Sequence, residues 1–112
     1  MAEKKVSLDF VTGNVVVGTD PVTLDINDWI SFVASGANIF TVIIDDASKF
    51  NTGKKVLMYE VYDGNSGDTP TTKPNNTSQD IEVKYTVYAT TSNDVNRTEP
   101  DAPPRIIIVP HT

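Results

Sequence analysis

The segment from Ile81 to Thr90 narrows the possible folds most, because apolar and polar residues alternate along it. This two-residue period is typical of a β-strand with one buried face. It predicts Val83, Tyr85 and Val87 in the core, with Lys84 and Tyr88 outside. Composition agrees, since the chain has 14 Val, 9 Ile and 14 Thr but only 3 Leu and 6 Ala. Residues stiff at χ1 favour strands, and an all-helical fold is therefore excluded.

Shorter apolar patterns predict further strands, over residues 6–10, 15–17, 22–26, 29–33, 39–44, 56–62 and 106–109. Within 22–26, Val22, Leu24 and Ile26 share one face. The stretch 39–44 is apolar on both faces apart from Thr41, which predicts a central strand covered on both sides. Polar loops are predicted between the later strands, over residues 63–80 and 91–104.

Residues 45–55 are the only candidate for helix. Asp45 or Asp46 could cap a single turn at its N-terminus, and Gly53 could end it. Because one turn is unstable alone, Phe50 is expected to hold it against the core.

The whole pattern predicts one all-β domain over residues 1–112, with about seven to eight short strands and at most one short helical turn. Two sheets packed face to face, as a Greek-key sandwich of the cupredoxin-like or immunoglobulin-like kind, would bury the apolar faces. A small closed barrel is the alternative.

Several classes of function are excluded by what the sequence lacks. There is no Cys and only one His, His111, so disulfides, most zinc sites, Cys-ligated copper sites and His-based catalytic triads are ruled out. A net charge of −6 disfavours nucleic-acid binding. No apolar run approaches the roughly 20 residues that span a bilayer, and residues 1–5 lack the apolar region of a signal peptide.

Three segments resemble the cupredoxins, the β-sandwich family of blue-copper proteins. Residues 24–32 (LDINDWISF) resemble the entry into the family's core strand, with Asn27 where the family usually has Gly. Residues 40–45 (FTVIID) resemble the strand that begins with its first copper His. Residues 85–89 (YTVYA) resemble the strand that delivers its copper Cys. The order of features matches over most of the chain, and it implies a periplasmic or secreted protein.

The departures from the family concern the copper ligands. Phe40 occupies the position of the first His and Ala89 that of the Cys, while residues 90–104 contain neither His nor Met. A blue-copper site needs two His and one Cys in a trigonal plane. The resemblance therefore implies a metal-free, cupredoxin-like sandwich with no copper cofactor and no electron transfer.

Residues 63–68 offer oxygen ligands at Asp63, Asn65 and Asp68, a faint likeness to a calcium loop. The EF-hand pattern is not met, because Gly67 stands at a ligand position and Pro74 where the closing Glu should be. A plain turn is the favoured interpretation. Another acidic site is conceivable if the carboxylates of residues 25, 28, 45 and 46 converged, but capping and solvation explain them more simply.

Tyr62 and Tyr88 form the second candidate site. Strand parity places both on an outer face, where aromatic side chains can bind carbohydrate. Cross-strand packing under a loop is the favoured alternative for this pair.

The functional hypothesis is a non-enzymatic binding or interaction module, with a protein or a surface polymer as partner and no membrane span. The alternative is a module that binds carbohydrate or calcium. A site at the former copper end would require the loops 63–80 and 91–104 to meet beside Phe40.

Overall fold

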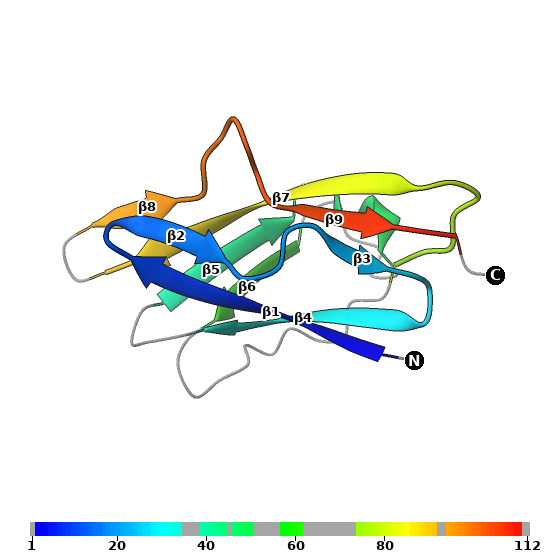
Figure 1. Ribbon diagram of the computed structural model, residues 1–112, viewed down its shortest axis with the longest axis horizontal. Coiled ribbons are helices and arrows are strands. Elements are labelled where there is room, and N and C mark those ends of the chain that lie inside the picture. The colour runs from blue at the N-terminus through cyan, green and yellow to red at the C-terminus, as the bar shows by residue number, and fades with distance from the viewer. Residues whose placement is uncertain are drawn as a thin grey trace.

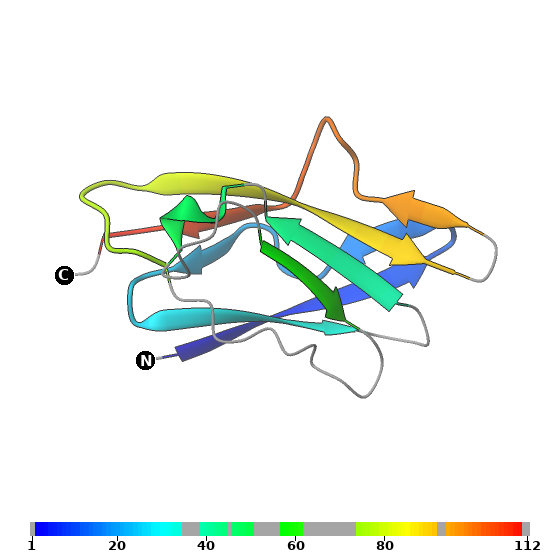
Figure 2. The same cartoon turned by 180° about the vertical axis from the view of Figure 1, so that it is seen from behind.

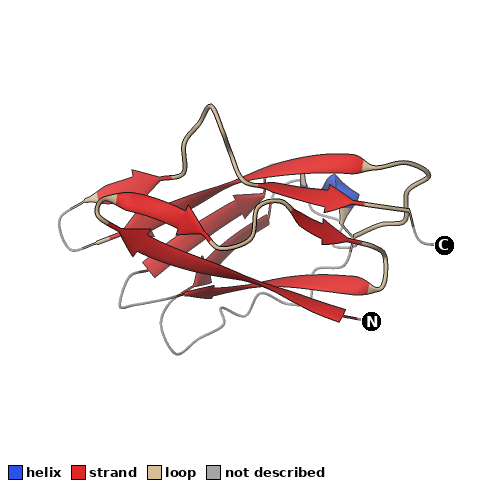
Figure 3. Ribbon diagram, in the orientation of Figure 1, coloured by secondary structure: helices blue, strands red, loops and turns tan. Residues whose placement is uncertain are grey.

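The computed structural model describes residues 2–34, 39–44, 46–50, 57–61, 74–91 and 94–110. Within these residues the chain forms nine strands and one 3₁₀ helix (Figure 1). Strands account for nearly all of the regular structure, as Figure 3 shows. The elements are β1 (Ala2–Val11), β2 (Asn14–Val17), β3 (Val22–Leu24), β4 (Asp28–Ala34), β5 (Ile39–Ile44), η1 (Ala47–Lys49), β6 (Leu57–Val61), β7 (Ile81–Thr90), β8 (Val95–Arg97) and β9 (Arg105–Ile108).

The strands make two sheets that face each other (Figure 2). The first sheet has the order β2-β1-β4, with β1 antiparallel to β2 and parallel to β4. The second has the order β3-β9-β7-β5-β6, and β8 also pairs with β7. The prediction of an all-β sandwich of two sheets is confirmed.

The core lies between the sheets and comes from alternate residues of the strands. On β7 the buried positions are Val83, Tyr85, Val87 and Ala89, which confirms the predicted register. The rings of Tyr85 and Phe32 meet edge to face across the core, with centroids 5.5 Å apart. The other fully buried large side chains are Phe40, Phe50, Leu8, Leu24, Ile30, Ile44, Ile106, Ile108, Val6 and Val42.

The chain crosses from the first sheet to the second between β2 and β3. The Gly18 N–H donates to the Ser7 carbonyl oxygen at 2.8 Å, so the crossing starts tight against β1. A Cβ at position 18 would overlap the Ser7 hydroxyl oxygen, which explains the glycine. At the far side of the crossing, Asp20 Oδ1 accepts a hydrogen bond of 2.9 Å from the Arg105 N–H at the start of β9.

Strand β5 differs from its prediction as a strand covered on both sides. It lies inside its sheet, between β7 and β6, but only one of its faces is buried. Phe40, Val42 and Ile44 point into the core, whereas Ile39 is 46% exposed. The prediction of cover on both sides was wrong, because no described element packs over the outer face of this sheet.

The predicted strand over residues 22–26 is too long. β3 ends at Leu24, and Asp25 to Asp28 form a turn in which the Asp28 N–H donates to the Asp25 carbonyl oxygen at 3.0 Å. The carboxylates close the same turn, since Asp25 Oδ1 accepts from the Asn27 N–H and Asp28 Oδ2 from the Asp25 N–H. Ile26 therefore lies in a turn and is half-buried.

Residues 91–104 are not the continuous loop that was predicted, because β8 interrupts them. Tyr88, Ala89 and Thr90 of β7 pair with Arg97, Asn96 and Val95. β8 is short, and its single apolar residue, Val95, is exposed, so apolar periodicity could not reveal it. Backbone pairing alone defines this edge strand.

The only helical turn in the described residues is η1, shorter than the predicted span. Asp46 precedes it but makes no capping bond to its backbone; its carboxylate accepts from the Ser48 hydroxyl instead. Phe50 is 2% exposed, which confirms that it anchors the turn. Asp45 and Gly53 lie outside the described residues. Phe50 also bridges to Pro74, a buried residue within a segment predicted to be wholly exposed.

Candidate functional site

Among the predicted site residues, the structure describes only Tyr88; Tyr62, Asp63, Asn65 and Asp68 lie outside the described residues. Tyr88 is half-buried on the outer face of β7, as its parity predicted. The guanidinium of Arg97, its partner on β8, lies 5.6 Å from the centre of the Tyr88 ring. This is a cation–π contact across neighbouring strands. The predicted alternative, packing of Tyr62 and Tyr88 under a loop, involves Tyr62 and lies outside the described residues.

Tyr88 shares its sheet face with several apolar side chains and with the polar residues Thr41, Glu60 and Thr90. Residues opposite each other in antiparallel strands share a face, so the pairs Thr41–Tyr88, Thr90–Val95, Ile39–Thr90 and Ile43–Met58 all point outward. Ile39, Met58 and Val95 are 46%, 67% and 56% exposed. We call this surface the outer patch; it comprises Ile39, Ile43, Met58, Tyr88 and Val95.

Most of the exposed large hydrophobic side chains among the described residues lie in the outer patch. The described residues have five exposed large hydrophobic side chains, and three of them lie in the patch. The other two, Val11 and Val16, lie on the β1–β2 hairpin of the first sheet. A gathering of this kind on a monomer marks an interaction surface more often than scattered single residues do.

The presumed copper positions lie opposite each other. Phe40 on β5 pairs with Ala89 on β7, and both side chains are fully buried. Ligands of a metal ion must carry donor atoms such as the imidazole nitrogen of His or the thiolate sulfur of Cys. A phenyl ring and a methyl group offer no donor atoms, so these residues do not fit a copper ion.

The described acidic candidates, residues 25, 28 and 46, make local hydrogen bonds instead. Asp25 and Asp28 close the turn after β3, and Asp46 accepts from Ser48. In the parts of the chain that the structure describes, no three His, Cys, Asp or Glu side chains are grouped so that they could hold a metal ion.

Residues 74–80 and residues 91 and 94, parts of the two predicted polar loops, lie at opposite ends of β7 (Figure 1). Residues 74–80 lead into Ile81, and Asn75 donates its N–H to the Lys49 carbonyl oxygen at 2.8 Å. Residues 91 and 94 are joined by a hydrogen bond beyond Thr90, at the end where Phe40 lies. The described residues therefore do not form one loop-built site beside Phe40.

Residues 98–104 form an arch along the edge of the second sheet. The Thr98 N–H donates to the Val87 carbonyl oxygen at 3.0 Å, and the Tyr85 N–H donates to the Pro104 carbonyl oxygen at 3.1 Å. Both feet of the arch are thus fixed to β7, while residues 99–103 leave the sheet. The Ala102 N–H closes a turn to the Glu99 carbonyl oxygen at 3.2 Å.

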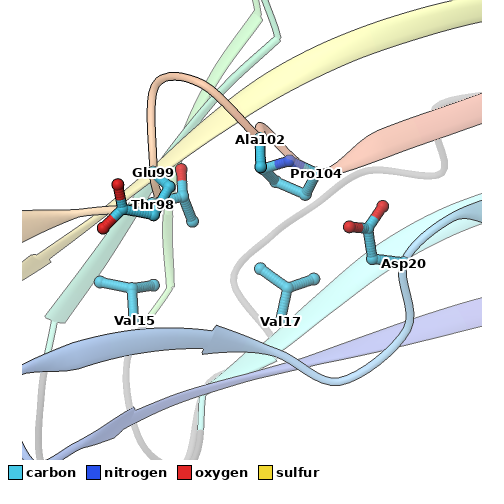
Figure 4. A pocket seen from close by; sticks show the side chains of 7 residues that line it. All are labelled: Val15, Val17, Asp20, Thr98, Glu99, Ala102 and Pro104. Atoms are coloured by element: carbon cyan, nitrogen blue, oxygen red, sulfur yellow. The ribbon is translucent and has the colours of Figure 1, made fainter.

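A groove lies beneath this arch (Figure 4). Val15 and Val17 rise from β2 to form its floor, and Ala102 and Pro104 form its roof. Glu99 and Asp20 stand at opposite ends of it in the view. We call it the arch groove; its volume is about 210 Å³, and Thr98 completes its lining. On the other side of the arch, a second cavity of about 370 Å³ shares Asp20 and Ala102 with it.

The charges around the groove are partly paired. Arg105 lies 3.9 Å from Asp20 Oδ1 through Nε and 3.4 Å from Glu82 Oε2 through Nη1. All three side chains are about 40% exposed, so each ion pair contributes little to stability. Inside the core, burial raises the pKa of Tyr85 above the usual range of a tyrosine, and the negative charge of Asp20 raises it further.

Sequence reasoning missed the arch groove. Asp20 and Glu99 are far apart in the chain, and no motif connects them. The polar segment 91–104 with its three prolines was the only signal, and it could not indicate which strand the segment would cover.

A scan against protein-family models and a search of curated proteins each found no match to this chain. No helix in the described residues is long and apolar enough to cross a membrane.

Proposed function

We propose that the chain is a non-enzymatic interaction module that binds a partner protein through the outer patch. The observation that supports this most strongly is that Ile39, Met58 and Val95, from three strands, are all exposed on one sheet face. Leaving these side chains in water has a cost that an apolar partner surface would remove.

We further propose that the fold is a cupredoxin-like sandwich that has lost its metal. The direct pairing of Phe40 with Ala89 supports this relationship, because the two presumed ligand positions fall on neighbouring strands. The same two residues argue against copper electron transfer, since neither can donate to a metal ion.

The partner's chemistry follows from the patch and the net charge. Apolar side chains on β5, β6 and β8 fit an apolar protein surface better than a polar polymer. A net charge of −6 favours a partner of positive charge, because long-range attraction speeds encounter.

Carbohydrate binding is the second candidate, because Tyr88 lies on an exposed sheet face. A sugar would have to stack on the ring that Arg97 already covers, which makes this candidate weaker. Calcium binding at residues 63–68 rests on the sequence pattern alone.

The test compares two double variants as bait for partner capture. Met58→Glu with Val95→Glu places charges in the outer patch. Val11→Glu with Val16→Glu places the same charges on the exposed hydrophobic residues of the other sheet. All four sites are exposed, so thermal midpoints should change little, and a melt of each variant verifies this.

We expect one protein to be retained by the wild type and by the Val11/Val16 variant but lost from the Met58/Val95 variant. Equal retention by all three would contradict the outer patch as the binding surface. Binding of a glycan that is lost on Tyr88→Ala but unaffected by Met58→Glu would favour the carbohydrate candidate instead.

A further inference from the structure

A row of four paired residues crosses the outer patch from β6 to β8. Thr41 of β5 pairs with Glu60 of β6 on one side and with Tyr88 of β7 on the other. Tyr88 in turn pairs with Arg97 of β8. Residues paired in this way share a face of the sheet, so all four lie on the outer face in this order. We call them the charged row, because a carboxylate stands at one end and a guanidinium at the other.

The two charges of the row have no counter-ion within the described residues. Glu60 and Arg97 are both exposed, and neither takes part in an ion pair with another described residue. They lie three strand spacings apart, about 14 Å, which is too far for an ion pair with each other. Arg97 Nε donates to the Thr98 carbonyl oxygen at 3.4 Å, and the guanidinium lies over the Tyr88 ring, so the cation stays on this face. The row therefore presents one negative and one positive charge to whatever covers the patch.

A row with opposite charges at its ends is complementary to a second copy of itself. β6 and β8 flank the adjacent strands β5 and β7, so they lie equally far from the line between those two strands. A two-fold axis along that line turns one copy face down on the other. It places Glu60 of each copy opposite Arg97 of the other copy, as a symmetric interface requires. A two-fold axis across the strands would bring like charges together instead.

The apolar side chains of the outer patch lie on both sides of the charged row. Ile43 and Met58 form a pair two residues to one side of it, and Ile39 and Val95 lie two residues to the other side. Ile39, Met58 and Val95 are exposed in the single copy. Face-to-face pairing through the row would cover both groups, and removing apolar surface from water favours association. The contact that matches the charges is thus also the contact that buries the apolar surface.

We propose that two copies of the chain pair face to face through the outer patch, held in register by two ion pairs between Glu60 and Arg97. Each copy carries a net charge of −6, so the copies repel each other at long range and the dimer is weak. A positively charged partner meets no such repulsion. This inference rests on the proposed function in taking the outer patch as a binding surface, and it adds that a second copy competes with the partner for it.

Sedimentation of the purified chain at increasing concentration measures this self-association without any partner. We expect an equilibrium of monomer and dimer. Glu60→Lys creates two contacts of like charge in the dimer and should raise its dissociation constant about tenfold or more, and Arg97→Glu should do the same. Asp80→Lys is the control, because it makes the same change in net charge as Glu60→Lys at an exposed residue outside the row. It should not raise the dissociation constant.

Mixing the two single variants tests the register of the dimer. When a Glu60→Lys copy meets an Arg97→Glu copy, opposite charges face each other at both ends of the row. The mixture should therefore form a mixed dimer with a dissociation constant near that of the wild type. The variant that carries both reversals should recover in the same way, whereas nonspecific apolar association would not depend on these pairings.

Three results would overturn the inference: a chain that stays monomeric at millimolar concentration, equal weakening by Asp80→Lys, or no recovery when the single variants are mixed. None of these results depends on the capture of a partner. Failure of self-pairing, with partner capture still lost in the Met58/Val95 variant, refutes this inference alone. A dimer that recovers on mixing, with capture unaffected in the Met58/Val95 variant, refutes the proposed partner site and leaves the dimer.

Discussion

Replacing Tyr85 by Phe should stabilise the protein, although it alters one of the largest fully buried side chains of the core. The substitution removes only the hydroxyl oxygen, whose hydrogen-bonding capacity no described residue meets. The ring stays, and with it the edge-to-face contact with Phe32 at 5.5 Å. No cavity of methyl size is created, so the packing cost should be small.

The expected gain follows from the cost of the unpaired group. A buried polar group without a partner costs about 1–3 kcal/mol, and taking the low end gives a gain of about 1 kcal/mol. For a chain of 112 residues this corresponds to a rise of about 4 °C in the thermal midpoint. Tyr88→Phe is the control, because Tyr88 is half-buried on the outer face; its effect should stay within about 0.5 kcal/mol.

The pH dependence of the same pair gives a second readout. Burial and Asp20 raise the pKa of Tyr85 above the usual value of 10.0, so the folded state holds this proton more tightly than the unfolded state. The wild type should therefore lose stability as the pH rises above 10. Tyr85→Phe has no hydroxyl that could ionise, so it does not lose this stability. Its free energy of unfolding relative to the wild type should therefore increase by about 1.4 kcal/mol at one pH unit above the usual tyrosine pKa.

Urea melts of wild type, Tyr85→Phe and Tyr88→Phe at neutral and alkaline pH measure both effects. If Tyr85→Phe lost 1 kcal/mol or more at neutral pH, the hydroxyl would have a partner that stabilises the fold. The inference that the buried hydroxyl is unpaired and costly would then be refuted.

Two further pairs of substitutions test the strand register and the sheet crossing. Val87→Asp buries an unpaired charge and should lower the free energy of unfolding by several kcal/mol, while Thr86→Asp on the outer face should cost about 1 kcal/mol or less; the reverse order in thermal melts would place β7 out of register by one residue. Gly18→Ala should destabilise through overlap with the Ser7 hydroxyl, and adding Ser7→Ala should recover part of the loss; strict additivity in this double-mutant cycle would show that the two residues do not clash.

The sheet architecture could be predicted from sequence because the alternation of apolar and polar residues reveals its strands. The alternation over β7 places Val83, Tyr85 and Val87 correctly, since the buried face of a strand has a strict period of two. The same pattern led to the wrong prediction that both faces of β5 are covered. Ile39 and Ile43 are apolar, but the alternation of residues does not indicate whether other elements cover the outer face of a strand. β8 has no buried apolar residue that could reveal it.

The candidate surfaces were predictable only in part. Parity placed Tyr88 outside, yet its contact with Arg97 depends on the pairing of β7 with β8, which was not foreseen. The outer patch requires the cross-strand register that brings Ile43 beside Met58. The arch groove joins Asp20 to Glu99 through a crossing between sheets, and such long-range placement leaves no local pattern in the sequence.

We propose that the second sheet presents a protein-binding surface at Ile39, Met58 and Val95. Methyl-detected NMR of the domain, titrated with the protein that the wild type captures, tests it most directly. The methyl signals of these three residues should shift or broaden first, while those of Val11 and Val16 on the other sheet stay unchanged. The proposal would be contradicted if the methyl signals of Val11 and Val16 shifted while those of Ile39, Met58 and Val95 did not.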